Sequence, residues 1–200
     1  MTKQLGFLEE PGKKERIKAP SVVKRLNAAV RARVERVKIL VLDVDGVMTD
    51  GRLIYHDDGT ESKAFDVRDG HGIKMLKQAG IETALISGRS SPLVEKRAAD
   101  LGISKVVQGT RDKVPHLEEI LSAKNLKFDE AAFMGDDVVD LTVMNRVGFA
   151  VVVADGSEYL FDTAHYVTLA PGGRGAVREV VELILGVQGL WDTIAGRYFE

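Results

Sequence analysis

The sequence predicts an α/β fold in which a mostly parallel sheet carries helices on both faces. Short apolar runs alternate with helical patterns throughout the chain after residue 37, as in proteins built from strand–helix–strand units. Three of the apolar runs end directly in polar residues, and parallel sheets of this kind bind ligands beyond the carboxyl ends of their strands. A chain of 200 residues with 44% hydrophobic residues suits one domain with its own core.

The composition narrows the range of functions. The formal net charge is −2 at pH 7, so the overall charge favours neither nucleic acid nor an anionic membrane as a partner. The chain has no cysteine, which excludes disulfides, thiolate metal sites and a cysteine nucleophile. No run approaches the roughly 18 apolar residues of a transmembrane helix, and the amino end lacks the apolar core of a signal peptide. We therefore expect a cytoplasmic protein.

Residues 1–35 are predicted to form an N-terminal extension, and residues 36–200 the main domain with its C-terminal tail. The segment up to about residue 20 is polar and rich in Lys and Glu, as in a loosely docked segment. Residues 21–35 carry an apolar stripe with Ser21 as N-cap, which predicts a helix. Its basic residues allow a nucleic-acid interpretation, but no aromatic residue is interleaved with them, which favours a solvated helix face.

The rest of the chain is organised around residues 37–51. Residues 39–42 are a continuous apolar run, which predicts a fully buried strand. Asp43 and Asp45 follow it and, being two residues apart, project to the same side of an extended backbone. Carboxylates at the end of a buried strand need hydrogen bonds or a cation. Mg²⁺ is the usual cation where phosphate is also present.

The later elements follow in order. An Asp-Gly pair in residues 57–60 separates two short alternating runs, 52–56 and 62–67, and predicts a β-hairpin. Beyond it, helical periodicity alternates with short apolar runs. The predicted helices are 72–80, 92–101, 113–124, 138–147 and 176–185. The predicted strands are 81–86, 105–108, 131–134 and 148–153, with an edge strand at 166–168.

Three predicted strands end in residues that suit one site: Asp43 with Asp45, Ser87, and Asp136 with Asp137. If these ends converge, the carboxylates bind Mg²⁺, while Lys113 and Arg89 add positive charge. Such a set suits a phosphoryl group, whose transfer needs positioning and charge neutralisation. An aspartate can attack phosphorus, and a second carboxylate can protonate the leaving oxygen. The alternative is that each polar set is only a helix N-cap, which is as reasonable for Ser87 alone but weak for all three.

These residues carry a resemblance to the haloacid dehalogenase superfamily. Residues 43–51 resemble its first motif, and Ser87, Lys113 and residues 135–140 resemble its second, third and fourth motifs. The resemblance implies that Asp43 is the nucleophile and Asp45 the general acid/base, with Ser87 and Lys113 orienting the phosphoryl group. It also implies that Mg²⁺ is held by Asp43, the backbone carbonyl of Asp45, and Asp136. Asp137 and Asp140 would support the metal and Lys113, with a helix cap as the alternative for Asp140.

A narrower resemblance is to the 3-deoxy-D-manno-octulosonate 8-phosphate (KDO 8-phosphate) phosphatase family. It is carried by residues 65–73 and 172–179, and by residues 87–89 with Arg97. It implies a Rossmann-like core with a small hairpin insert and no large cap domain. It also implies a homotetramer whose hairpins pair, with sites closed by a neighbouring subunit and the C-terminal tail. The residues that it implies around the sugar acid are Asp45, Asp66, Val67, Arg68, Asp69, Gly70, Lys74, Arg89, Arg97, Lys113 and Arg174.

The implied activity is hydrolysis of KDO 8-phosphate through an aspartyl-phosphate intermediate, for lipopolysaccharide synthesis. Arginines suit the carboxylate of such a sugar acid, although a plain helix-surface role for Arg97 stays open. The glycines of residues 172–175 suit a mobile lid or simply a loop before a helix. His71 either contacts substrate or caps the following helix, and Trp191 and Phe199 are interpreted as packing residues.

Other functions remain as alternatives. A sialic acid or KDN 9-phosphate phosphatase shares the core motifs, and Arg68 with residues 172–178 favours the eight-carbon substrate. A non-catalytic regulatory module has no reason to keep Asp43, Asp45, Lys113 and Asp136. A phospho-receiver domain has no need of Asp45 as a proton donor, and its phosphoacceptor follows a later strand. We expect a small phosphorylated sugar acid as ligand, and neither nucleic acid nor membrane as partner.

Overall fold

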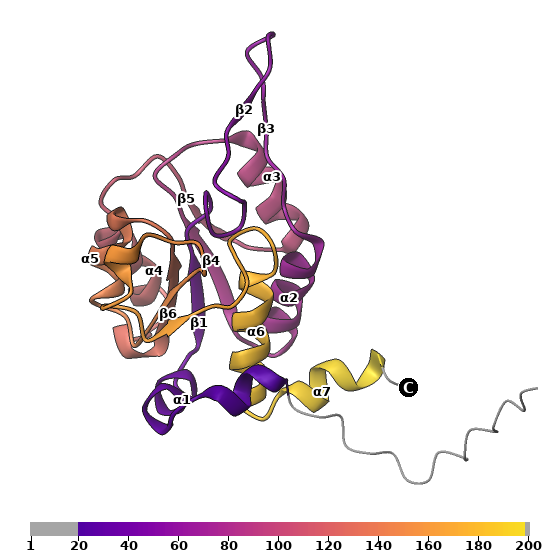
Figure 1. The fold of residues 1–200 in the computed structure, drawn as a ribbon, viewed down its shortest axis with the longest axis vertical. Helices are drawn as coiled ribbons and strands as arrows, with labels where there is room; N and C mark the ends of the chain where they lie inside the picture. The colour runs from indigo at the N-terminus through magenta and orange to yellow at the C-terminus, as the bar shows by residue number, and fades with distance from the viewer. Residues whose placement is uncertain (1–19, 199–200) are drawn as a thin grey trace, which may run out of the picture.

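The computed structural model describes residues 20–198, and within them a six-stranded parallel sheet confirms the expected α/β fold (Figure 1). The strand order is β5-β4-β1-β6-β7-β8, and every neighbouring pair is parallel. The strands are β1 (Ile39–Leu42), β4 (Glu82–Ile86), β5 (Lys105–Val107), β6 (Ala131–Gly135), β7 (Phe149–Val152) and β8 (Tyr166–Val167). A separate antiparallel hairpin consists of β2 (Ile54–Tyr55) and β3 (Glu61–Ser62).

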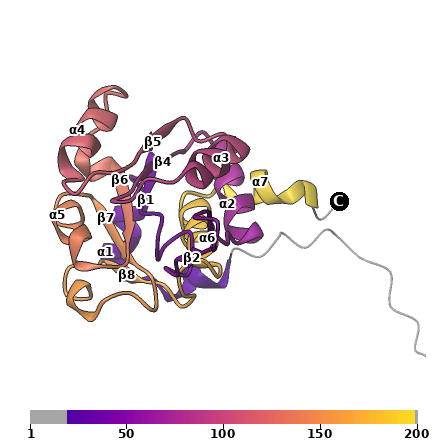
Figure 2. The same ribbon diagram turned by 90° about the horizontal axis from the view of Figure 1, so that it is seen from above.

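Helices cover both faces of the sheet, as expected (Figure 2). The helices are α1 (Ala28–Val34), α2 (Val67–Gln78), α3 (Pro92–Leu101), α4 (Val114–Ser122), α5 (Leu141–Met144), α6 (Ala176–Val187) and α7 (Trp191–Ala195). Short 3₁₀ turns are η1 (Ser21–Arg25), η2 (Phe128–Glu130), η3 (Val138–Asp140), η4 (Glu158–Leu160) and η5 (Gly196–Tyr198). No helix within residues 20–198 is long and apolar enough to span a bilayer.

The continuous apolar run of β1 follows from its place in the middle of the sheet. Leu40 and Leu42 pack into the core under α1, α2, α3 and α6. Ile39 and Val41 pack into the opposite core under α4 and α5. A central parallel strand is buried on both faces, so alternation between apolar and polar residues is lost.

Several predicted elements have different boundaries in the structure. The helix predicted over residues 21–35 is divided into η1 and α1, because the Asn27 side chain accepts a hydrogen bond from the Val30 N–H and caps a new helix. The helix predicted from residue 72 begins at Val67, where the Asp66 carboxylate accepts from the Arg68 and Asp69 N–H groups. Residues 62–67 are therefore not a strand, and β3 ends at Ser62.

Glycine in α2 has a packing role that the sequence did not reveal. A Cβ at Gly72 would lie 3.2 Å from the Arg178 side chain and 3.3 Å from that of Val181, so Gly72 allows α2 and α6 to pack closely.

The helix predicted over residues 138–147 is shorter in the structure, where it consists of η3 and α5.

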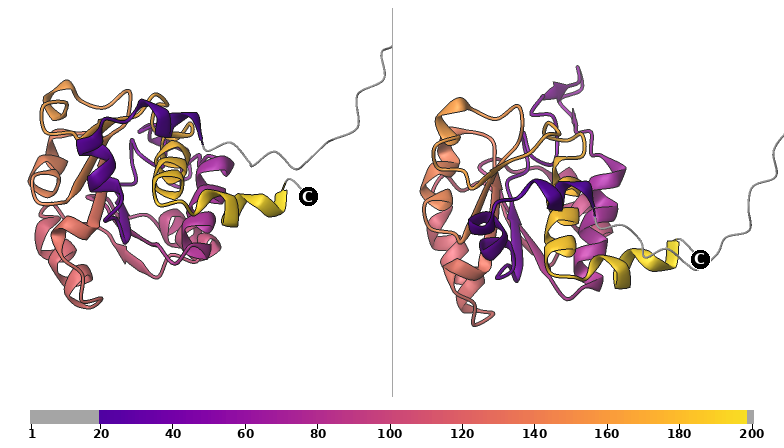
Figure 3. Two further views of the ribbon diagram at one scale, coloured as in Figure 1. Left: turned by 90° about the horizontal axis from the view of Figure 1, so that it is seen from below. Right: turned by 60° about the horizontal axis from the view of Figure 1, so that its bottom comes forward.

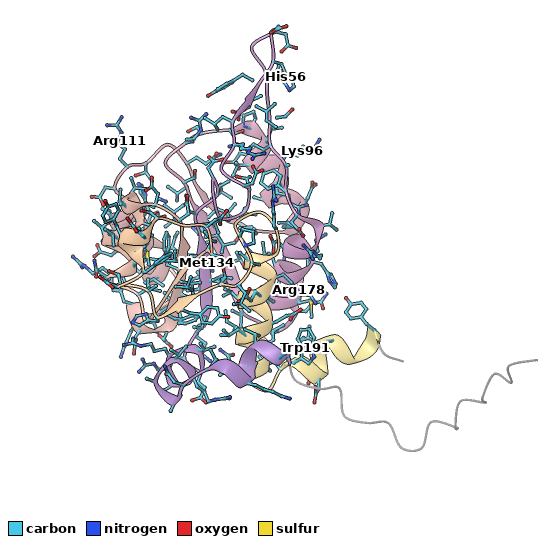
Figure 4. All side chains as sticks on the ribbon, in the orientation of Figure 1. His56, Lys96, Arg111, Met134, Arg178 and Trp191 are labelled. Atoms are coloured by element: carbon cyan, nitrogen blue, oxygen red, sulfur yellow. The ribbon has the colours of Figure 1, made fainter. Side chains whose placement is uncertain are left out.

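The hairpin and α7 lie at opposite ends of the molecule (Figures 1 and 3). Between β1 and α2 the chain forms only this small hairpin, which stands beyond the carboxyl ends of the strands with His56 near its tip (Figure 4). At the other end, Trp191 packs against the core, and the Arg178 guanidinium lies 5.9 Å from its ring centre. The predicted extension before residue 20 and Phe199 lie outside the described residues.

Candidate active site

The topology places a switch point between the carboxyl ends of β1 and β6. The chain leaves β1 towards α2 on one face of the sheet and leaves β6 towards α5 on the other, which is the arrangement where open α/β sheets bind ligands. Asp43 follows β1, and its N–H donates to the Met134 carbonyl of β6 at 3.0 Å. Carboxylate oxygens of Asp43, Asp136 and Asp140 lie within 4.8 Å of one another. A compact cluster of aspartates therefore lies at this switch point.

Lys113 supplies the positive charge inside this cluster. Its side chain is 2% exposed, and its Nζ lies 2.9 Å from Asp43 Oδ1 and 2.6 Å from Asp140 Oδ1. The other oxygen of Asp140 accepts from the Asp136 N–H at 3.0 Å. Asp140 thus fixes both the lysine and the loop after β6.

The pKa values of the cluster reflect burial opposed by charge pairing. Burial raises the pKa of Asp43, the Lys113 charge works against this, and the Asp140 charge adds to it. Burial, followed by the charges of Asp43 and Asp140, raises the pKa of Asp136 to about 8. For Lys113, burial would lower the pKa, but the two neighbouring carboxylates outweigh it and the pKa is raised. The site therefore favours the binding of additional positive charge.

The donor set of the cluster fits a hard divalent cation. Three carboxylates face one ammonium, and Lys113 is shared between Asp43 and Asp140, so the negative charge exceeds the positive charge. Buried carboxylates of this kind are costly unless they coordinate a metal or are fully paired. All the donors are oxygen, which suits Mg²⁺. Both oxygens of Asp140 are occupied, by Lys113 and by the Asp136 N–H. Asp43 and Asp136 are therefore the carboxylates that can ligate the cation.

Asp45 lies beside this cluster with different surroundings. Its Oδ1 pairs with the ammonium of Lys63, whose side chain is only 1% exposed. Its Oδ2 lies 3.8 Å from Arg89 Nε and is buried without a hydrogen bond from the described part of the chain. Arg89 is itself contacted from the hairpin by the Tyr55 hydroxyl at 3.3 Å and by Glu61 at 3.7 Å. The hairpin strands β2 and β3 and the segment after β3 thus hold both cations that flank Asp45.

Ser87 ends β4, the strand next to β1, and is buried. Its hydroxyl accepts a hydrogen bond from the Arg89 N–H at 3.3 Å. The cap of α3 is a different serine, Ser91, whose hydroxyl accepts from the Leu93 N–H. The alternative role of Ser87 as a helix N-cap is therefore not what the structure shows.

A second group of the predicted site residues lies where the N-termini of α2 and α6 meet. The buried Asp69 carboxylate accepts from the N–H groups of Gly175 at 3.2 Å and Arg178 at 2.7 Å. Arg68 pairs with Asp66 and donates to the Arg174 carbonyl at 3.2 Å. The Arg174 guanidinium is mostly exposed and lies 3.9 Å from Asp50. This group adjoins the loop after β1.

Close packing accounts for two glycines that suited a lid. A Cβ at Gly172 would overlap the Gly46 carbonyl oxygen, and one at Gly173 would overlap the backbone of Thr49 and Asp50. The Gly173 N–H also donates to the Val47 carbonyl at 2.9 Å. Segment 172–175 therefore rests directly on the loop that carries Asp45.

The remaining predicted residues gather elsewhere in the chain. Val67, Gly70, Lys74 and Arg97 line a cavity of about 190 Å³ between α2 and α3, together with His71 and Leu101. Arg97 also donates to the Asp66 carbonyl at 3.1 Å and stacks over the Phe65 ring. This cavity shares no lining residue with the aspartate cluster. His71 contacts Tyr198 and Arg178.

Lys63 is the site residue that sequence reasoning missed. The sequence pattern predicts only a hairpin strand for it, because nothing in the local pattern distinguishes it from a solvated lysine. The signal that was available is its place in the short insert directly after the Asp43–Asp45 motif, since an insert at this position must lie over the strand ends. Its burial and its pairing with Asp45 appear only in the fold.

The chain was compared with protein families and with individual proteins of known structure or function. A family model described as haloacid dehalogenase-like hydrolase matches residues 102–177. The 3-deoxy-D-manno-octulosonate 8-phosphate phosphatase of Escherichia coli K12 is 44% identical over 172 residues, which cover 86% of this chain and 92% of that protein. The corresponding protein of Yersinia pestis is 46% identical over 164 residues, covering 82% and 88%.

A solved structure of similar fold contains ligands. The 3-deoxy-D-manno-octulosonate 8-phosphate phosphatase of Moraxella catarrhalis, crystallised with a magnesium ion, a phosphate ion and KDO, is 41% identical and superposes with a TM-score of 0.83. The match covers 84% of this chain and 97% of that one.

Proposed function

The chain belongs to the 3-deoxy-D-manno-octulosonate 8-phosphate phosphatase family of haloacid dehalogenase-like hydrolases, and we propose that it hydrolyses KDO 8-phosphate to KDO and phosphate. The observation that carries this proposal is the buried cluster of Asp43, Asp136 and Asp140 around Lys113. The related Moraxella catarrhalis enzyme binds magnesium, phosphate and KDO, which matches the chemistry of this cluster. The product would supply lipopolysaccharide synthesis.

Residues in the cluster and beside it have roles in a two-step displacement. Asp43 attacks phosphorus, the ester P–O bond breaks, and the sugar oxygen takes a proton from Asp45. Water then attacks the aspartyl phosphate and gives a proton to Asp45, the bond to Asp43 breaks, and phosphate leaves. Lys113 and Ser87 hold the phosphoryl oxygens throughout. Mg²⁺, held by Asp43, Asp136 and the Asp45 carbonyl, would offset the repulsion between Asp43 and the phosphate dianion.

The sugar acid carries a second negative group that needs its own partner. Guanidinium groups bind carboxylates with two parallel hydrogen bonds. Arg89 borders the cluster, and the exposed Arg68 and Arg174 adjoin the loop after β1. We assign these three arginines to the substrate carboxylate. We propose the eight-carbon substrate in preference to a nine-carbon substrate of the same chemistry.

We further propose a homotetramer whose sites are completed by neighbouring subunits. Val67, Gly70, Lys74 and Arg97 line a cavity apart from the Asp43 cluster of their own chain, so they would serve the site of another subunit. The hairpin also presents exposed Leu53, Ile54 and Tyr55. An isolated two-stranded hairpin is marginally stable in water, so pairing between the hairpins of several subunits would stabilise it.

The first experiment is a phosphate-release assay with Mg²⁺ on KDO 8-phosphate and on sialic acid 9-phosphate. We expect faster release from the eight-carbon compound and none after chelation of the metal. Asp43→Asn should abolish turnover without unfolding the chain, while Asp100→Asn, on the exposed face of α3, should keep full activity. Turnover by Asp43→Asn would refute the nucleophile, and equal rates on both sugars would refute the substrate assignment alone.

A further inference from the structure

Lys63 forms an ion pair with Asp45, although the proposed reaction steps assign no role to Lys63. Its side chain is 1% exposed, and its ammonium pairs with Asp45 Oδ1. Burying an ammonium is costly unless it is paired and hydrogen-bonded, so this ion pair constrains the conformation of the segment after β3. Lys63 precedes α2 by only a few residues and belongs to neither β3 nor α2. The position of Lys63 is therefore set by the path of the segment between β3 and α2 over the carboxyl ends of the strands.

The two oxygens of Asp45 are unequal as a result. Oδ1 is occupied by Lys63. Oδ2 is buried, accepts no hydrogen bond from residues 20–198, and has only the Arg89 guanidinium at 3.8 Å. An unsatisfied buried oxygen in a native fold calls for an explanation, and an active site is a common one. The free oxygen is the one that remains available for proton exchange with a substrate.

We propose that Lys63 is a positioning residue that holds Asp45 by Oδ1 and so presents Oδ2 to the leaving oxygen of the substrate. The inference rests on the proposed function, because it assigns Lys63 to the proton-transfer step of that reaction. Without Lys63, the Asp45 side chain can rotate, and Arg89 can pair with either oxygen. Catalysis is sensitive to such misplacement, since an error of about 1 Å can cost roughly 10²-fold in rate.

The role of Lys63 can be separated from general support of the fold by the choice of leaving group. A sugar alkoxide is a poor leaving group and needs the proton from Asp45 as the ester bond breaks. A p-nitrophenolate leaves without that proton, so hydrolysis of p-nitrophenyl phosphate uses Asp43, Lys113 and the metal but not the acid function of Asp45. General acid catalysis contributes about 10²–10⁴-fold, which sets the size of the difference to be measured.

The experiment compares kcat and KM for KDO 8-phosphate and p-nitrophenyl phosphate in Lys63→Met, Lys63→Arg and the wild type. The comparison uses kcat/KM, which reports the steps up to release of the leaving group and excludes the later attack of water, a step common to both substrates. Lys63→Met should lower kcat/KM for the sugar phosphate by about 10²-fold and for p-nitrophenyl phosphate by less than about tenfold, with little change in KM. Lys63→Arg keeps the charge and should recover part of the lost kcat/KM. Lys124→Met is the matched control, since Lys124 pairs with Glu82 on another part of the surface, and it should leave both rates unchanged.

Several outcomes would overturn the proposal. An equal loss of kcat/KM on both substrates would make Lys63 a structural residue, and a raised KM with unchanged kcat would make it a substrate ligand. If Lys63→Met does not fold, as judged by circular dichroism, the same two-substrate ratio measured on Lys63→Arg decides, and an unchanged ratio with reduced rates rejects the positioning role. A wild type inactive on both substrates would instead refute the proposed function itself.

Discussion

Asp43 and Asp45 are two residues apart in the chain, yet their carboxylates have different surroundings. Asp43 shares Lys113 with Asp140 and faces Asp136. Asp45 lies between Lys63 and Arg89. Lys63 belongs to the segment after β3, and Arg89 is contacted by the hairpin. Environments that differ in this way allow two carboxyl groups to take different catalytic roles. The different roles that we propose for the two aspartates, nucleophile and proton carrier, would therefore originate in their partners rather than in their spacing.

The raised pKa of Asp136 predicts how metal binding depends on pH. The pKa is raised from 3.8 to about 8, so between these values the metal-free folded chain holds a proton that the unfolded chain lacks. This contribution to stability is complete below about pH 3.8 and is lost as the pH rises to about 8. Because Mg²⁺ must displace the proton, its apparent affinity should rise by up to about tenfold per pH unit until about pH 8.

Isothermal titration calorimetry in two buffers of different ionisation enthalpy measures this proton release. Mg²⁺ should also raise the thermal midpoint of unfolding, by mass action on the folded state. Asp136→Asn has no proton to release and should bind Mg²⁺ weakly with little dependence on pH. An affinity that is constant between about pH 6 and 8 in the wild type would contradict the raised pKa.

Gly46 offers a second test of the metal site. It has a φ of +95°, and a Cβ there would overlap the Asp136 carboxylate. Gly46→Ala should therefore weaken Mg²⁺ binding by at least about tenfold, in addition to the roughly 1 kcal/mol of strain that a positive φ imposes on alanine. Gly59→Ala is the matched control, because Gly59 has a φ of +81° with nothing within 4 Å of the added Cβ. Equal Mg²⁺ affinity in both variants would contradict the steric argument.

At the scale of elements, the N-termini of α2 and α6 are joined through one carboxylate. Asp69 belongs to the first turn of α2 and accepts hydrogen bonds from the Gly175 and Arg178 N–H groups at the start of α6. The preceding loop 172–175 packs on the loop after β1. The position of Asp69 thus links helix packing to the shape of the site, in addition to any contact with substrate.

This arrangement predicts a loss of stability in Asp69→Ala. The substitution would leave two N–H groups of a buried helix terminus without an acceptor, which should lower the free energy of unfolding by about 1–3 kcal/mol. Denaturant unfolding measures the change. Asp100→Ala, an exposed aspartate on α3, should change stability by less than about 0.5 kcal/mol. Equal stabilities of the two variants would show that the Asp69 hydrogen bonds contribute little.

The sequence predicted the sheet and the strand-end cluster because both depend on local patterns. The apolar run of β1 and the polar residues after β1, β4 and β6 are visible in a single chain. The predicted start of α2 was too late because the apolar periodicity begins only at Ile73, although Asp66 as N-cap with Asp69 in the first turn is a recognisable start signal. Contacts such as Lys63 with Asp45 and Asp69 with α6 depend on how distant segments pack, which no local pattern contains.

At the scale of the whole molecule, the hairpin couples the site to the outer surface. Lys63 follows β3, while Tyr55 and Glu61 lie within β2 and β3, and these three side chains contact Asp45 or Arg89. The two strands of the hairpin pair over only two residues each. Leu53, Ile54 and Tyr55 of the hairpin are exposed. A hairpin this short has little stability of its own. Whatever covers its apolar side chains therefore also stabilises the groups around Asp45.

Assembly and activity should consequently be lost together when the hairpin surface is charged. Ile54→Glu places a carboxylate in the proposed contact between hairpins, so it should shift the protein to smaller species in analytical ultracentrifugation. In the same samples kcat/KM for KDO 8-phosphate should fall by up to about 10²-fold, because the Lys63 and Arg89 contacts lose their support. Tyr159→Glu changes another exposed hydrophobic residue, away from the hairpin, and should alter neither property. A wild type that is monomeric and fully active would refute the coupling, whereas loss of assembly with retained activity would show that the hairpin and the segment after β3 hold Asp45 unaided.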